Sequence, residues 1–106
     1  FLYDELSNIT SMQPKIFSIL QNYPNPFNPR TTIDFYLEED RFVSADIYDL
    51  KGIFVRTLFS EFKVKGSHTV SWDGKDYKGN NASSGIYYFR AEVDTYVKSK
   101  KMLLIR

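Results

Sequence analysis

Residues 31–48, TTIDFYLEEDRFVSADIY, contain two runs in which apolar and polar side chains alternate. The apolar members of these runs are Ile33, Phe35, Leu37, Val43, Ala45 and Ile47. A period of two places every second side chain on the same face of a strand, so that one face is apolar and the other meets water. The stretch therefore predicts two half-buried strands of the antiparallel type.

Outward from this stretch, further segments have the composition of strands. They are residues 16–20, 53–59, 68–72, 84–93 and 96–105. Turn residues separate them: the sequence LKG at 50–52 predicts a tight hairpin, and KGS at 65–67 predicts the same for the next connection. The segment DGKDYKGNNASS at 73–84 is rich in Gly, Asp and Asn, and we expect it to be the longest loop.

Seven short strands and no helix of normal length predict an all-β, immunoglobulin-like antiparallel β-sandwich, because an apolar sheet face needs a second sheet to cover it. We expect the inward side chains to include Ile33, Phe35, Ile47, Val70, Trp72 and Tyr87. The single Trp is expected in this core rather than on a ligand-binding surface. With no Cys, the disulfide-bonded antibody type is excluded.

Composition excludes several classes of protein. A chain of 106 residues is long enough for one small domain and too short for a multi-lobed enzyme. A formal net charge of +1 is too even for the basic surface that binds nucleic acid. No apolar run is long enough for a transmembrane segment, and there is no N-terminal signal peptide, so we expect the chain to be part of a longer protein.

Catalytic and metal-binding residues are not expected. The sequence has no Cys and only one His, His68, which removes thiolate zinc sites and clusters of imidazoles. His68 alternates with apolar residues, so it is predicted as a packed or edge residue. No nucleophile-elbow pattern or recognisable pair of carboxylates is present, and we therefore predict a protein that is not an enzyme and needs no cofactor.

The loop residues Asp73, Asp76 and Asn81 raise the question of calcium, since carboxylates in Gly-containing loops bind hard cations. Their spacing is not that of an EF-hand. Asx-turns account for the same residue types without a metal, and that is the interpretation we prefer.

Two N-terminal segments differ from the strands. Residues 1–15, FLYDELSNITSMQPK, lack a clean period and are predicted to be a linker from a preceding domain. Residues 21–29, QNYPNPFNP, hold three of the four Pro, which fix the backbone and exclude a helix. We expect this proline segment to be a rigid entry to the first full strand.

Four blocks in order carry a resemblance to a known family. They are QNYPNPFNPRTTIDFYL, ADIYDLKGIFVRTL, HTVSWDGKDYKGNNASSGIYYFRAEV and the final KSKKMLLIR. Together they resemble the C-terminal sorting domain of the type IX secretion system, over residues 16–106. The middle blocks also resemble the immunoglobulin-like domain of flagellar hook-capping proteins, so the ending KKMLLIR contributes most to the choice between the two families.

The resemblance implies a secretion signal rather than a catalyst. Such a domain directs an attached N-terminal cargo domain across the outer membrane of a Gram-negative bacterium. The implied partners are the type IX translocon and its sortase-like surface peptidase, and the implied destination, reached through the periplasm, is the cell surface or the medium. The family motifs fall on Pro24, Asn25, Pro26, Gly85, Ile86, Tyr87, Lys100 and Lys101.

Simpler interpretations of these residues stay open. In these interpretations the prolines do no more than stiffen a loop, and Gly85 marks a bulge or a close contact between sheets. The lysines would then lie on an edge strand, where they discourage aggregation. Two other kinds of function also stay open. One is a carbohydrate-binding module, which the eight Tyr permit although no cluster of Trp supports it, and the other is a structural assembly domain.

Overall fold

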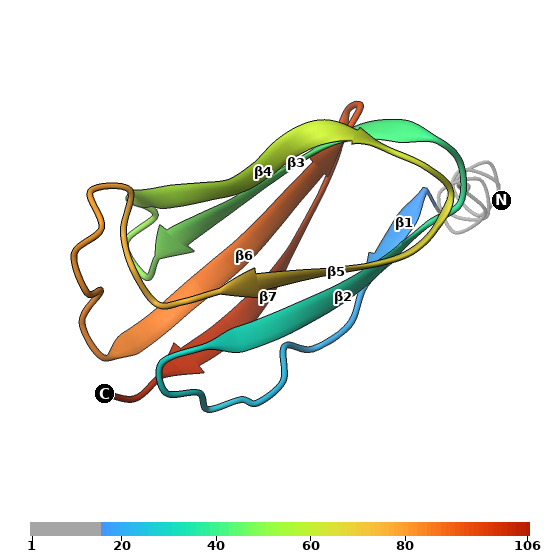
Figure 1. Ribbon diagram of the computed structural model, residues 1–106. Helices are drawn as coiled ribbons and strands as arrows, with labels where there is room; N and C mark the ends of the chain where they lie inside the picture. The colour runs from blue at the N-terminus through green and yellow to red at the C-terminus, as the bar shows by residue number, and fades with distance from the viewer. Residues whose placement is uncertain (1–15) are drawn as a thin grey trace, which may run out of the picture.

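A computed structural model describes residues 16–106 of the chain, which contain seven strands (Figure 1). Their bounds are β1 Phe17–Ile19, β2 Thr31–Leu37, β3 Arg41–Asp49, β4 Phe54–Lys63, β5 Gly66–Trp72, β6 Gly85–Val93 and β7 Tyr96–Leu104. Every pair of neighbouring strands is antiparallel, and the sheets have the orders β1-β2-β5 and β4-β3-β6-β7. The predicted immunoglobulin-like sandwich is confirmed.

The predicted linker, residues 1–15, lies outside the described residues, so the domain boundary at residue 16 stays a prediction. No helix within residues 16–106 could cross a membrane.

The connection at residues 65–67 differs from the prediction. A hairpin was expected there, yet β4 pairs with β3 and β5 pairs with β2, so the chain passes from one sheet to the other at this point. The backbone N–H of Lys65 donates to Asp40 Oδ1 at 2.7 Å, which ties the crossing to the connection between β2 and β3. Gly66 is a genuine positive-φ residue, but a glycine turn signal does not specify whether the next strand joins the same sheet. At residues 50–52 the predicted turn is present, with Gly52 at φ +83°.

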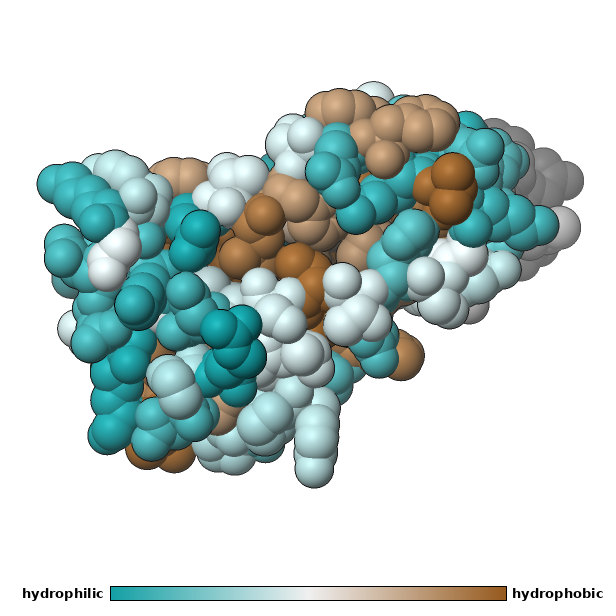
Figure 2. Space-filling view, in the orientation of Figure 1, coloured by the Kyte–Doolittle hydropathy of each residue, from teal (hydrophilic) through white to brown (hydrophobic). Residues whose placement is uncertain are grey.

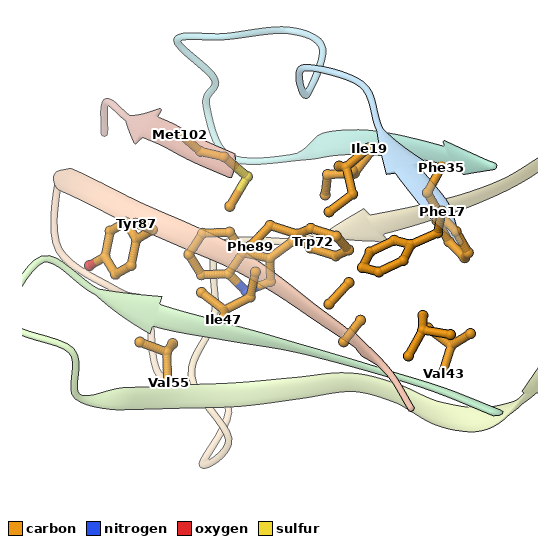
Figure 3. Close-up of a cluster of buried hydrophobic side chains, with 14 of the residues drawn as sticks. Phe17, Ile19, Phe35, Val43, Ile47, Val55, Trp72, Tyr87, Phe89 and Met102 are labelled. Atoms are coloured by element: carbon orange, nitrogen blue, oxygen red, sulfur yellow. The ribbon is translucent and has the colours of Figure 1, made fainter. Parts of the chain in front are cut away.

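Large aromatic side chains fill the space between the sheets (Figure 3). Trp72 is 1% exposed, and its ring centroid lies 5.6 Å from that of Phe27 and 5.1 Å from that of Tyr87. Its indole N–H donates to the carbonyl of Lys75 at 2.9 Å, so the one polar atom of the buried ring is satisfied. Phe27, contributed by the proline segment, was not predicted in the core because that segment has no period.

Five of the six predicted core residues are buried, and Val70 is the exception. It faces inward opposite Ile33 but is only partly buried, as are Leu58 and Phe59 on β4. β4 and β5 are edge strands of different sheets, and apolar side chains are visible between them in Figure 2. The sandwich is therefore less closed on this side than the alternation alone predicts.

Replacing Trp72 by Ala is expected to lower the free energy of unfolding by about 3 to 5 kcal/mol, the usual loss for a large buried aromatic ring. Tyr77→Ala is the matched control, because Tyr77 is 65% exposed and its removal opens no cavity. Urea denaturation of both variants measures the difference. Equal midpoints for Trp72→Ala and the native chain would contradict the position of Trp72 in the core.

Candidate functional site

The proline segment lies along the outer edge of β7 and pairs with it. Phe27 N–H donates to the carbonyl of Leu103, and Ile105 N–H donates to the carbonyl of Phe27, both at 3.0 Å. The Asn25 side chain continues this pattern, since its Oδ1 accepts the backbone N–H of Leu103 at 3.0 Å. β7 is the last strand of its sheet, so these contacts occupy backbone groups that an edge strand leaves unpaired.

Buried polar side chains hold the proline segment in shape. Asn22 and Thr31 are 2% and 1% exposed, and Asn22 Nδ2 donates to Thr31 Oγ1 at 2.9 Å. Both side chains also donate to the carbonyl of Pro24, at 3.1 Å and 2.9 Å. Gln21 Nε2 donates to the carbonyl of Lys101 at 2.9 Å, which adds another contact with β7. The segment is therefore stiffened by hydrogen bonds as well as by its prolines.

A groove of about 360 Å³ forms where this segment meets the outer face of the four-stranded sheet. Its lining residues are Gln21, Asn25, Ile86, Lys101, Met102 and Leu103. They bring together one residue from each of the three predicted motifs, although Asn25 and Lys101 are far apart in sequence. Ile86 lies opposite Leu103 in the β6–β7 pairing, which gives the groove an apolar floor beside one ammonium group. We call this the motif groove and take it as the candidate functional site.

The remaining predicted residues do not all reach the motif groove. Pro24 and Pro26 are exposed neighbours of Asn25, and Gly85 is the first residue of β6. A Cβ on Gly85 would meet nothing within 4 Å, so close approach of another segment is not the reason for glycine there. Its pairing with Leu104 continues the regular β6–β7 register without a bulge.

Tyr87 and Lys100 lie on the opposite side of the sheet from the motif groove. Tyr87 alternates with Ile86 along β6 and is buried in the core at 7% exposure. Lys100 alternates with Lys101 along β7 and is half-buried, on the same side of the strand as buried Met102. The motifs predicted from sequence are thus divided between two faces. The roles of all eight motif residues stay predictions.

The sequence analysis missed Gln21, Met102 and Leu103 in the groove, and it missed the position of Arg106. Arg106 N–H donates to Ser84 Oγ at 2.8 Å, and its guanidinium donates to the carbonyls of Ala82 and Gly74. A Cβ built on Gly74 would lie 2.8 Å from both Arg106 Nη2 and the carbonyl oxygen of Pro29. The end of the chain, the 73–84 loop and the proline segment therefore meet at Gly74.

Turn hydrogen bonds engage the acidic residues of the 73–84 loop. Asp76 Oδ1 accepts the N–H groups of Lys78 and Asn80, both at 2.9 Å. Asp73 Oδ1 accepts the N–H of Lys75 at 3.1 Å and lies 3.4 Å from Arg56 Nη1. These are the contacts that the Asx-turn interpretation requires. Within residues 16–106 no group of three or more His, Cys, Asp or Glu side chains is placed to hold a metal ion.

Lys98 on β7 and His68 on β5 make defined contacts. Lys98 Nζ donates to the carbonyl of Phe17 at 2.7 Å and lies 5.3 Å above the Phe17 ring, so it links β7 to β1 across the two sheets. His68 stacks on Phe35 at 5.3 Å, and its Nε2 lies 2.7 Å from the carbonyl oxygen of Val64. His68 is thus packed on an edge strand, as the sequence predicted.

The Tyr87 hydroxyl donates to the carbonyl of Ser83 at 2.7 Å, and the surroundings of this hydroxyl raise its pKa. Burial raises the pKa of Tyr87 above its ordinary value, the Asp49 carboxylate raises it further, and the Arg106 guanidinium acts in the opposite direction. The folded protein therefore retains this proton to higher pH than the unfolded chain does.

Tyr87→Phe tests this environment. At neutral pH we expect the variant to be less stable by about 1 kcal/mol, because the hydrogen bond to Ser83 is lost. When the pKa of a Tyr is higher in the folded than in the unfolded protein, its contribution to stability is constant at pH values below the unfolded-state pKa of about 10. This contribution is lost as the pH rises through the folded-state pKa. The stability gap between native chain and variant should therefore narrow above about pH 10. Urea denaturation at stepped pH measures it, and a gap that widens there would contradict the pKa direction.

Gly74→Ala tests the junction of the three segments. Left-handed backbone costs about 1 to 2 kcal/mol for a residue with a Cβ. Gly79→Ala carries that cost alone, because Gly79 has φ +85° and open space around it. Gly74→Ala carries the clash with Pro29 and Arg106 as well, so we expect it to be less stable than Gly79→Ala by about another 1 to 3 kcal/mol. Thermal melts measure the difference between the two variants. Equal melting temperatures would show that Pro29 and Arg106 do not approach Gly74 closely.

Comparison with known proteins identifies the family. A family model described as the FlgD Ig-like domain matches residues 28–96, and the chain belongs to this family. No curated protein matches the chain.

Solved structures show the same fold. Dimeric latent PorU from Porphyromonas gingivalis aligns with a TM-score of 0.70 at 21% identity, over 89% of this chain and 10% of PorU. FlgD from Xanthomonas campestris, described in relation to hook capping in flagellar assembly, aligns with a TM-score of 0.58 at 22% identity, over 92% of this chain and 72% of FlgD.

A further similar structure is PorZ from P. gingivalis, described as an essential surface component of the type IX secretion system. It aligns with a TM-score of 0.53 at 25% identity, over 85% of this chain and 11% of PorZ. The chain therefore spans about a tenth of the length of PorU and of PorZ.

Proposed function

We propose that this domain is a sorting signal of the type IX secretion system, which directs an attached cargo protein through the outer-membrane translocon to the cell surface or the medium of a Gram-negative bacterium. In this role the domain is a substrate of the translocon and of a sortase-like surface peptidase. It performs no catalysis and needs no cofactor.

The observation that carries the proposal is the motif groove. Three sequence motifs that resemble the sorting family place Asn25, Ile86 and Lys101 around one depression. If the prolines served only to stiffen a loop, residues from the other two motifs would not need to lie beside that loop. The likeness to PorZ supports the same assignment, because PorZ is described as a component of this secretion system.

The chemistry of the groove suggests what part of the translocon would contact it. Ile86 and Leu103 offer apolar surface, Gln21 and Asn25 offer carboxamides, and Lys101 offers a positive charge. A loop with apolar and acidic side chains would complement this set. Beside the motif groove, the backbone edge of β7 is already paired with the proline segment at Leu103 and Ile105, so recognition here would use side chains rather than strand addition.

The full chain fused to a periplasmic reporter should move that reporter outside a host that carries the type IX machinery. Within this fusion, Lys101→Ala should reduce the exported fraction by about tenfold, a loss typical of one charged contact. Lys100→Ala is the matched control, because Lys100 is the adjacent lysine on the other side of β7, and we expect nearly native export. Melting temperatures confirm that both variants fold.

Export is measured as reporter activity in the medium, at the surface and in the periplasm. If the intact fusion stays in the periplasm of a competent host, the sorting proposal fails. If Lys100→Ala blocks export and Lys101→Ala does not, the sorting role survives but the motif groove is the wrong surface.

An assembly role is the second candidate, and membership in the FlgD Ig-like family favours it. A domain of this kind would hold neighbouring proteins in a larger structure. A fusion that stays in the periplasm and forms defined oligomers at micromolar concentration would support this alternative.

A further inference from the structure

A second depression, of about 450 Å³, lies on the outer face of the four-stranded sheet beside the motif groove. Its lining includes Tyr48, Leu50, Tyr88, Arg90 and Ser99. Tyr88 pairs with Tyr48 on one side and with Lys101 on the other, so the two depressions share the β6–β7 surface. We call it the tyrosine depression.

The outward position of these residues follows from strand alternation. Tyr48 follows buried Ile47 on β3, and Tyr88 and Arg90 flank buried Phe89 on β6. Arg90 lies opposite Ser99 of β7 in the antiparallel register. The aromatic rings and the polar groups therefore come from three adjacent strands, which gives the depression a rigid floor.

The polar groups of the tyrosine depression have little to bind within the described chain. The Arg90 guanidinium carbon lies 5.8 Å from the centroid of the Tyr48 ring, and Glu92 Oε1 is 3.8 Å from Arg90 Nη1, beyond hydrogen-bonding distance. Among residues 16–106, no hydrogen bond engages the Arg90 guanidinium or the side-chain hydroxyls of Tyr48, Tyr88 and Ser99. One guanidinium and three hydroxyl-bearing side chains thus line the same depression.

Asp49 also borders the depression but is engaged by the adjacent turn. Its Oδ1 accepts the N–H groups of Lys51 and Ile53, both at 2.9 Å. That carboxylate is therefore held by the turn. Asp46, which lies opposite Arg90 on β3, accepts a hydrogen bond from Thr57 Oγ1 at 2.8 Å. Neither carboxylate is hydrogen-bonded to Arg90 within residues 16–106, so the donors of its guanidinium are free for an anionic group of a ligand.

We propose that the tyrosine depression binds a sugar that carries a carboxylate, of the uronic acid class. The planar guanidinium of Arg90 can donate two parallel hydrogen bonds to a carboxylate. The apolar face of a pyranose ring can pack on the Tyr rings, and its hydroxyls can bond to Tyr48, Tyr88 and Ser99. The volume is within the range of small-molecule sites.

A sheet face suits a sugar better than an acidic peptide. An extended peptide gains much of its affinity from backbone hydrogen bonds to a free strand edge. In the tyrosine depression, β3 and β6 are internal strands, so their backbone groups are already used in the sheet. Side chains alone are available, and here they are aromatic, hydroxylic and cationic. The proposal does not depend on the sorting function, because it uses different residues.

The experiment titrates the full chain with a galacturonic acid trisaccharide and follows backbone amide shifts by NMR. The neutral galactose trisaccharide, acetate and triglutamate serve as comparison ligands. We expect the acidic sugar to bind at least about tenfold more tightly than each comparison ligand, with the largest shifts at Tyr48, Tyr88 and Arg90. No binding, or equal affinity for any comparison ligand, would overturn the proposal; equal binding of triglutamate would indicate an acidic-peptide site instead.

Variants assign the contact to Arg90. Arg90→Gln should weaken acidic-sugar binding by about tenfold, whereas Arg30→Gln, which changes an exposed Arg outside the depression, should have no effect. Tyr88→Phe removes only one hydroxyl and supplies an independent variant should Arg90→Gln fail to fold; we expect it to weaken binding about threefold. Native affinity in a folded Arg90→Gln or in Tyr88→Phe would overturn the site.

Discussion

The pairing of the proline segment with β7 is the constraint on which the rest of this structure depends. A four-stranded sheet that ends in β7 would otherwise leave the N–H of Leu103 and the carbonyls beside it facing water. Asn25 and Phe27 occupy these groups, and Phe27 also enters the core beside Trp72. Because Pro has no N–H, a segment with three of them covers the edge of β7 at Lys101 and Leu103 without presenting another complete edge to a second chain.

The alternation of apolar residues predicted the strands well because each strand buries one face. It did not predict which strands share a sheet: the glycine signal at residues 65–67 is local, whereas the crossing from β4 to β5 is decided by the pairing of β5 with β2. Val70 shows the same limit. Periodicity correctly predicts that its side chain faces inward, but Val70 is only partly buried because β5 is an edge strand, and periodicity does not identify edge strands. Phe27 was missed because burial in a segment without a period leaves no pattern.

The candidate site was predicted in part, and the missing information was partly in the sequence. Ile86 and Tyr87 are neighbours in one motif, yet alternation puts them on opposite faces of β6, and the same holds for Lys100 and Lys101 on β7. Once Tyr87 was expected in the core, Ile86 had to face outward. What sequence could not supply was the approach of Asn25 to Leu103, which joins residues 78 positions apart through hydrogen bonds of an irregular segment.

These contacts make the surface of the site inseparable from the fold. β7 contributes Lys101, Met102 and Leu103 to the lining of the motif groove, and the buried residues Met102 and Leu104 to the core. Arg106 then ties the end of β7 to the 73–84 loop at Gly74, where Pro29 also approaches. Losing the last strand would therefore remove core packing, the groove and the partner of the proline segment together. A partner that binds this surface would necessarily distinguish folded from unfolded domain, because an extended C-terminal peptide contains Lys101 and Leu103 but has neither Ile86 nor Asn25 beside them.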